Sequence, residues 1–196
     1  MARPLPGRVS TDLVGIGAVA QPTSGLVEIT NVYKSDVFPG AQVIRLDFKL
    51  TKARVAITDG TTSGSYGSLK LFDFAEGAIS FLGSRQDYTA YASDGTGVPN
   101  DTAFAIGLGT AAIAAAADGT LGTGTSQDIG KSIAQTLSSG TTTGTAVTAA
   151  VAAGNGTATP IDLNLNVSGS AATVDGDGWL DVTATISVLL MFMGDD

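Results

Sequence analysis

Hydrophobic and polar residues alternate with a period of two along most of this chain. In the clearest run, residues 161–168, the apolar residues stand only at every second position: Ile161, Leu163, Leu165 and Val167. Successive side chains of a strand point to opposite faces, so this pattern predicts a half-buried antiparallel strand.

A longer run near the C-terminus predicts a strand with two different faces. One face is apolar throughout: Leu180, Val182, Ala184, Ile186, Val188, Leu190 and Phe192. The other face is polar from Asp181 to Ser187 and becomes apolar at Leu189, Met191 and Met193. We therefore expect this strand to begin half-exposed and to end buried on both faces, covered by a packed sheet or by another subunit.

Residues 43–57 show the same alternation with a change of phase. Ile44, Leu46, Phe48 and Leu50 form one apolar set, and after Thr51-Lys52 the set becomes Ala53, Val55 and Ile57. A shift of one residue reverses the faces of a strand, so a β-bulge or corner is expected near Thr51. The other side carries Arg45, Asp47, Lys49, Lys52 and Arg54, and we interpret it as a solvated strand face rather than a basic binding face.

Further alternating segments predict strands at 26–33, 68–74, 78–82 and 104–108. We interpret Ala75-Glu76-Gly77 as a hairpin connection between two of them. Ser126–Ser139 is the best helix candidate, because Ile129, Ile133 and Leu137 share one face of a helix. Many short strands separated by turns predict an all-β fold: an antiparallel β-sandwich or single jelly roll with long Gly/Thr/Ala-rich loops and at most one or two short helices.

The length of 196 residues fits one domain. Residues 1–20 are predicted to form an extended N-terminal arm, and residues 21–196 one sandwich domain with a low-complexity insertion at about 110–156. Residues 13–20 superficially resemble a secretory signal, but Asp12 and two glycines interrupt the pattern, so the arm is preferred. The C-terminal apolar run is far shorter than the roughly 20 residues of a membrane-spanning helix.

The composition excludes several classes of function. The chain has no Cys and no His, which removes thiolate and histidine metal sites, cysteine nucleophiles and Ser-His-Asp triads. Its formal net charge of -8 argues against binding to a nucleic-acid backbone. We therefore expect no enzyme and no cofactor, and favour a structural or binding role.

The acidic residues are concentrated in the second half of the chain. Residues 87–196 contain one basic residue, Lys131, and all of their acidic residues are Asp. In Asp175-Gly176-Asp177-Gly178, the absence of the later EF-hand ligands excludes that motif. A looser Ca²⁺ site shared with Asp94 or Asp101 is an alternative, and a turn stabilised by Asp-Gly pairs is preferred, so no metal site is assigned.

The C-terminal segments Leu163–Gly169 and Ala172–Ile186 resemble small jelly-roll virion proteins of tailed bacteriophages, and Phe72–Leu82 and Ser84–Asp87 fit the same style. The resemblance implies a capsid cement or decoration protein, commonly a homotrimer, on the outer surface of the phage head. Its partners would be the major capsid protein and copies of itself, with no nucleic acid and no membrane. The resemblance carries over no catalytic residue.

The candidate partner contacts are residues without an internal role in the predicted sandwich: Arg3, Arg8, Leu13, Val14, Ile16, Leu189, Met191 and Met193. We expect the arm and the basic first half to contact the capsid, and the Asp/Thr-rich half to face solvent.

Three alternatives remain open. The first is another virion component, such as a single-jelly-roll capsid or tail protein. The second is a secreted carbohydrate-binding or adhesive β-domain, in which Tyr88, Tyr91 or Trp179 would contact the sugar; aromatic residues that bracket a strand more often pack in the core. The third is an enzyme with an unusual Asp/Glu/Ser/Lys site.

Overall fold

A computed structural model describes residues 9–10, 16–38, 41–60, 64–75, 78–99, 102–113, 128–136, 151–155, 161–169 and 174–193. These ranges contain eleven β-strands and no helix. The strands are β1 (Val9–Ser10), β2 (Gly17–Val19), β3 (Leu26–Phe38), β4 (Ala41–Asp59), β5 (Ser65–Phe74), β6 (Ala78–Ser93), β7 (Ala103–Gly109), β8 (Gly130–Thr136), β9 (Val151–Asn155), β10 (Asp162–Gly169) and β11 (Gly178–Met193).

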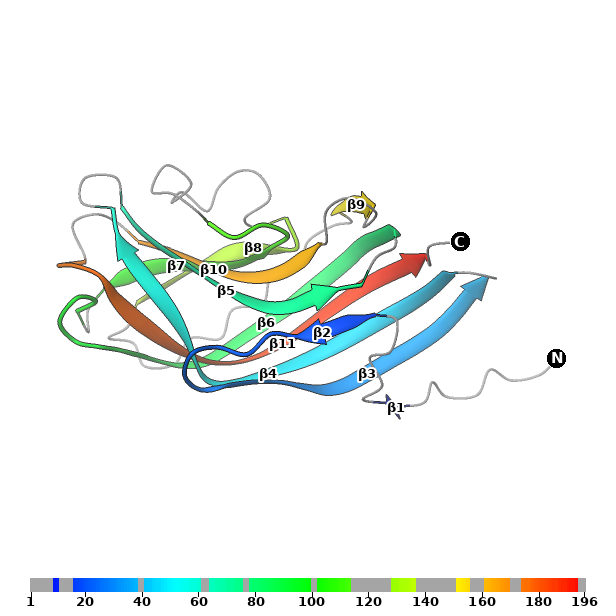
Figure 1. Cartoon of the computed structure of the whole chain (residues 1–196), viewed down its shortest axis with the longest axis horizontal. Helices are drawn as coiled ribbons and strands as arrows, with labels where there is room; N and C mark the ends of the chain where they lie inside the picture. The colour runs from blue at the N-terminus through cyan, green and yellow to red at the C-terminus, as the bar shows by residue number, and fades with distance from the viewer. Residues whose placement is uncertain are drawn as a thin grey trace.

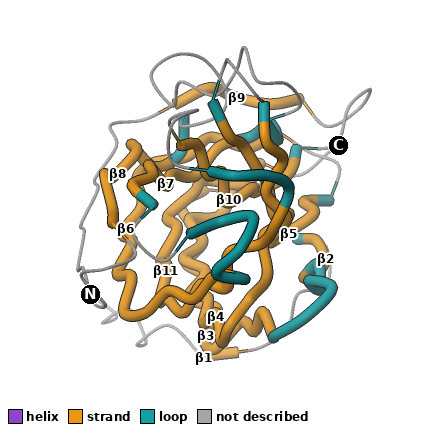
Figure 2. The backbone as a smooth tube through the Cα atoms, turned by 90° about the vertical axis from the view of Figure 1, so that its left-hand side faces the viewer, coloured by secondary structure: helices purple, strands orange, loops and turns teal. Residues whose placement is uncertain are grey.

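The strands form two antiparallel layers that pack on each other (Figure 1). Sheet A has the order β1-β3-β4-β11-β6-β9, and sheet B has the order β2-β5-β10-β7-β8. The two layers are joined where the end of β4 leaves sheet A, because Thr58 and Asp59 pair with the start of β5. Figure 2 views the sandwich from one end.

The eight strands from β4 to β11 pair first with last. β4 pairs with β11, β5 with β10, β6 with β9, and β7 with β8. These four antiparallel pairs are distributed over two four-stranded sheets, β4-β11-β6-β9 and β5-β10-β7-β8. This arrangement is the jelly roll, which confirms the predicted fold class.

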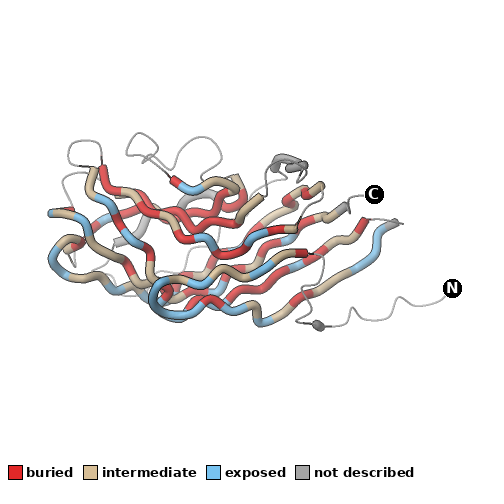
Figure 3. The backbone as a smooth tube through the Cα atoms, in the orientation of Figure 1, coloured by how far each residue is buried: buried red, intermediate tan, exposed pale blue. Residues whose placement is uncertain are grey.

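The inner faces of the two sheets enclose one hydrophobic core. Ile44, Leu46, Phe48 and Leu50 are fully buried there, and so is the predicted apolar face of β11 from Leu180 to Leu190. Figure 3 shows these buried positions alternating with exposed ones along the strands. Aromatic rings of the two sheets pack edge to face. The ring centres of Phe72 and Phe48 lie 5.9 Å apart, and those of Phe74 and Phe81 lie 5.6 Å apart.

The change of phase in β4 is a bulge, as predicted. The register between β4 and β11 shifts so that Thr51 and Lys52 both lie opposite Thr183. Lys52 has a positive φ of 49°, and its amide donates a hydrogen bond to Thr183 Oγ1 at 3.2 Å. The bulge allows both apolar sets of β4 to face the core.

The predicted helix at Ser126–Ser139 is wrong. Gly130–Thr136 forms β8, which pairs with β7, and residues 126–127 and 137–139 lie outside the described part. The spacing of Ile129, Ile133 and Leu137 by four residues is compatible with one face of a helix but also with one face of a strand. The stretch 110–156 thus contributes an edge strand to each sheet, β8 to sheet B and β9 to sheet A.

The predicted hairpin around Ala75-Glu76-Gly77 is also wrong. β5 lies in sheet B between β2 and β10, whereas β6 lies in sheet A between β11 and β9. The short connection therefore crosses from one sheet to the other. Phe74 and Phe81, on either side of it, both point into the shared core, and their burial favours this crossing over a hairpin.

Candidate interaction surface

Part of the outer face of sheet B is covered by the chain itself. After β7, residues 110–113 cross this face, where Asn166 Nδ2 donates to the carbonyl of Ala111 at 2.9 Å and the amide of Ile113 donates to Ser68 Oγ at 2.7 Å. The polar side of β10 is therefore buried, with Asn166 at 0% exposed and Asn164 at 3%. The expected antiparallel strand is present as Asp162–Gly169. The expectation that it is half-buried is wrong, because its polar side chains are buried against residues 110–113.

The outer face of sheet A carries a hydrogen-bonded group centred on Asp47 of β4. The Asp47 carboxylate is only 5% exposed and accepts hydrogen bonds from Arg45 Nε and Ser187 Oγ, both at 2.7 Å. The Arg45 guanidinium also lies 5.3 Å from the ring centre of Tyr33 on β3. These contacts from three strands fix the orientation of Arg45, half of whose side chain remains exposed.

Apolar side chains adjoin this group on the same face. Leu189 of β11 pairs directly with Arg45, and Met191 pairs with Val43. Leu189 is 38% exposed, while Met191 and Val43 are half-buried. Of the two covers expected for this end of β11, a packed sheet is absent from the described residues, so within that part of the chain the second face is open.

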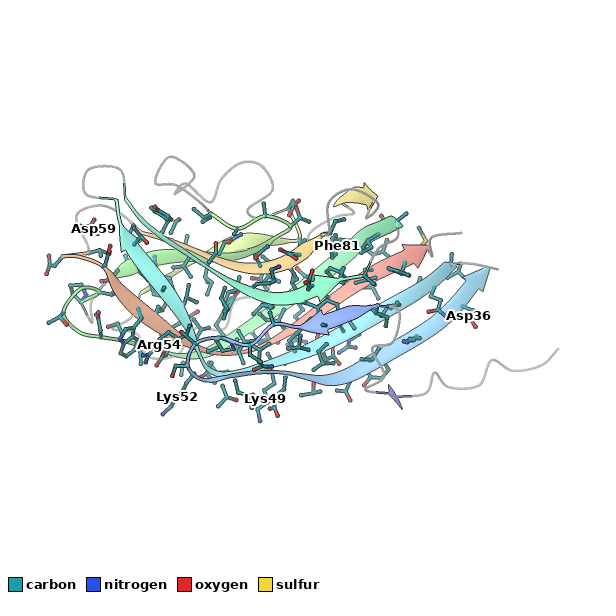
Figure 4. The ribbon with its side chains drawn as sticks, viewed as in Figure 1. Asp36, Lys49, Lys52, Arg54, Asp59 and Phe81 are labelled. Carbon is teal, nitrogen blue, oxygen red and sulfur yellow. The ribbon has the colours of Figure 1, made fainter. Side chains whose placement is uncertain are left out.

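The remaining arginines of this face are paired with acids. Arg54 donates to both carboxylate oxygens of Asp181 at 2.7 and 2.8 Å, and its guanidinium lies 3.7 Å from the ring centre of Trp179. The hydrogen bonds that Arg54 donates to Asp181 raise the pKa of Arg54. Arg85 pairs with Asp87 at 2.7 Å. Figure 4 shows Lys49, Lys52 and Arg54 on the side of β4 away from the core, but these acids prevent a continuous basic patch.

The predicted partner contacts do not all lie on one surface of the structure. Arg3, Arg8, Leu13 and Val14 lie outside the described residues, as does the side chain of Met193, the last residue of β11.

Ile16 is 2% exposed and belongs to the hydrophobic core. Its carbonyl accepts a hydrogen bond from Ala75, and β2 directly after it pairs with β5. Ile16 therefore packs within its own chain and is corrected from a partner contact to a core residue. Leu189 and Met191 remain as candidates.

The alternation in the sequence placed Arg45 and Asp47 on one face, which was interpreted as solvated, whereas Asp47 is buried and holds Arg45. Arg45 and Asp47 stand two residues apart in a predicted strand, and opposite charges at this spacing share a face, so this pair had a detectable signal. Tyr33 and Ser187 had none, because their positions depend on the register of β3 and β11 against β4.

The aromatic residues proposed for sugar contact are mostly internal. Tyr88 is 0% exposed and donates a hydrogen bond to Gln86, while Tyr91 packs edge-on against Phe104 with 5.1 Å between ring centres. Burial raises the pKa of both tyrosines well above the usual value. The core interpretation of Tyr88 and Tyr91 is thus confirmed, and Trp179 is half-buried beside Arg54.

The loop carboxylates stabilise turns. Asp177 accepts a hydrogen bond from the amide of Asp59 at 2.8 Å, and Asp94 accepts one from the amide of Val98 at 2.8 Å. Asp101, the other residue considered for a Ca²⁺ site, lies outside the described part. Among the described residues, no group of three or more acidic side chains is arranged to hold a metal ion.

One further charged cluster joins β5 to β10. Lys70 Nζ lies 2.8 Å from a carboxylate oxygen of Asp162. Burial raises the pKa of Asp162, Lys70 lowers it, and nearby Asp73 raises it again. The cluster connects the two strands electrostatically. A cavity of about 10 Å³ between the sheets, lined by Val98, Phe104 and Leu180 among others, holds one water molecule at most.

No protein-family model matches this chain, and no curated protein is significantly similar to it. In the described part of the chain, we find no helix with the length and hydrophobicity needed to cross a bilayer. In its described part, the chain is an all-β jelly roll in which residues 110–113 cover part of the outer face of sheet B and the outer face of sheet A is open.

Proposed function

We propose that this protein is a structural virion protein, a cement or decoration protein that binds the outside of a phage head and stabilises contacts between capsomers. The outer face of sheet A, which is open in the described part of the chain, carries this proposal. It combines the exposed Leu189 and the half-buried Met191 with a fixed arginine and a tyrosine, Arg45 and Tyr33. Such a combination is typical of surfaces that bind other proteins.

The physical basis of the proposed activity is linkage. A protein that binds only the assembled shell stabilises the shell by the free energy of binding, because separated capsomers lose that contact. The jelly roll suits this work, since its hydrogen-bonded sheets and aromatic core hold a surface in a fixed shape. The net charge of -8 is consistent with a position outside the shell, away from the packaged nucleic acid.

The proposed capsid contact is the N-terminal arm, and a deletion tests it. The deletion should end at residue 15, because Ile16 and β2 belong to the core and to sheet B. It also removes the two-residue edge strand β1, which pairs with β3, so the fold of the variant has to be verified. Heads of the phage that encodes this chain, prepared without the protein, would be incubated with the full-length protein or with the variant lacking residues 1–15. Cosedimentation and electron microscopy would measure occupancy, and circular dichroism would verify the fold.

We expect the full-length protein to occupy the heads and to raise the temperature at which they open. The shortened variant should keep its β-sheet spectrum and lose occupancy. Failure of the full-length protein to bind heads would contradict the cement function. Unchanged occupancy of the shortened variant would contradict only the role of the arm. Labelling of tails in intact virions would favour the alternative of another virion component.

A further inference from the structure

We propose that the outer face of sheet A is the surface through which copies of this chain associate, with a second copy docking over Arg45, Leu189 and Met191. This inference concerns self-association and stands whether or not the protein binds a capsid. The sequence resemblance implied that copies of the chain associate, but it did not say through which residues. The inference names those residues.

The exposed apolar residues are all in one sheet. In the described part of the chain, three large hydrophobic side chains are exposed: Leu26 at 41%, Val37 at 55% and Leu189 at 38%. Leu26 and Val37 lie in β3 and Leu189 in β11, both of sheet A. The described side chains of sheet B contribute none of them, and residues 110–113 cover part of its outer face. Among the described side chains, the exposed large apolar residues are therefore confined to sheet A.

The polar part of the face is already in position for binding. Arg45 is held by Asp47 and by the ring of Tyr33, so docking restricts few of its rotamers. Tyrosine and arginine are among the residue types that contribute most to protein interfaces. The buried carboxylate of Asp47 is satisfied within the chain, so a partner need not supply a charge to it.

The face has the area that a stable interface needs. It spans the four strands β3, β4, β11 and β6 and is about as long as the 13-residue β3. With strands about 4.8 Å apart and a rise of about 3.3 Å per residue, it measures roughly 19 by 43 Å, or about 800 Å². Standard interfaces bury about 800 Å² on each partner.

The distribution of charge favours docking of a second copy on this face over docking on any other surface of the chain. Five basic side chains lie on the face, Arg45, Lys49, Lys52, Arg54 and Arg85, with four acidic ones, Glu28, Asp47, Asp87 and Asp181. The face is therefore close to neutral, at +1, and the rest of the chain carries the other 5 basic and 14 acidic residues, or -9. Two copies repel each other through their other surfaces, and meet with little repulsion through this one.

Light scattering coupled to size-exclusion chromatography tests the proposal on the full-length protein. The wild type should elute with two or three times the chain mass of 19.5 kDa. Leu189→Asp places a charge at the centre of the face, and should weaken self-association at least about tenfold in analytical ultracentrifugation. Ala103→Asp is the matched control, because it adds the same charge at an exposed position of β7 in sheet B, and it should keep the wild-type mass.

A monomeric wild type at about 100 μM would overturn the proposal, and so would an oligomer that Leu189→Asp leaves intact. If circular dichroism shows that Leu189→Asp has unfolded, Met191→Lys on the half-buried neighbouring position replaces it. Loss of head binding by a Leu189→Asp variant that remains oligomeric would assign the face to the capsid and overturn the inference. Oligomers that never bind heads would contradict only the cement function.

Discussion

A single residue with an unusual backbone conformation makes the long strand β4 possible. Lys52 adopts a left-handed φ of 49° at the bulge, which costs a residue with a side chain about 1–2 kcal/mol. The bulge also fits the chain before β3, since Arg54 donates its amide to the carbonyl of Ser24. A Cβ on Gly25 would lie 1.9 Å from the Lys52 carbonyl oxygen, so only glycine permits this approach.

We expect Lys52→Gly to stabilise the protein. Glycine adopts a positive φ without the steric cost, although it loses more backbone entropy on folding. The net gain should be roughly 0.5 kcal/mol, or about 1–2 °C in Tm, measured by thermal denaturation.

Thr51→Gly is the control for this prediction. Thr51 lies in the same bulge without a positive φ, so the change should cost about 1 kcal/mol of stability. A lower Tm for Lys52→Gly would show that the left-handed conformation is not a source of strain.

At the scale of elements, the two sheets treat their outer faces differently. Residues 110–113 cover part of the outer face of sheet B. Their backbone groups form hydrogen bonds with the side chains of Ser68, Asn164 and Asn166. Asn166 is fully buried, and its side chain contacts both Ser68 and the carbonyl of Ala111. Side-chain hydrogen bonds thus hold residues 110–113 on sheet B, whereas apolar contacts hold the two sheets together in the core.

Ser68→Ala should loosen this covering segment. The Ile113 amide would lose its acceptor and Asn166 one partner, which should cost about 1–3 kcal/mol of stability. Hydrogen exchange would detect the change as faster exchange of the Ile113 amide. Thr185→Ala, which removes an exposed hydroxyl from β11, is the control, and unchanged protection of Ile113 in Ser68→Ala would contradict the hydrogen bond.

The sequence predicted the positions of the strands better than it predicted which strands pair with each other. Alternation located β4, β10 and β11 with their inward residues, since one buried face imposes a period of two. It failed where the local pattern is ambiguous, as at Ile129 and Ile133, whose spacing suits a helix and a strand. The hairpin at 75–77 and the cover of sheet B depend on long-range pairing, which no local pattern contains. The site was predicted only for its apolar part, Leu189 and Met191.

At the scale of the whole molecule, the first-with-last pairing makes most sheet contacts distant in sequence. Ile57 pairs with Gly178, and Ala41 pairs with Met193. Forming such contacts requires closure of long loops before any compensating contacts exist. Sheet A is therefore incomplete without β11, which lies between β4 and β6.

We expect slow refolding, in milliseconds to seconds or longer, measured by stopped-flow fluorescence of Trp179. A double-jump experiment with a short unfolding delay keeps the prolines in their native isomers, and so separates this phase from proline isomerisation. Complete refolding within microseconds would be incompatible with this topology.

The position of β11 also has a consequence for biosynthesis. Of the described strands of sheet A, the one between β4 and β6 leaves the ribosome last, because β11 follows the others in chain order. Until it does, the edges of β4 and β6 that pair with β11 are open, and the nascent chain presents unpaired strand edges. Cells that make this protein therefore need to protect a chain that lacks β11 from aggregation, and products stalled or truncated before β11 should be strong substrates for chaperones and proteases.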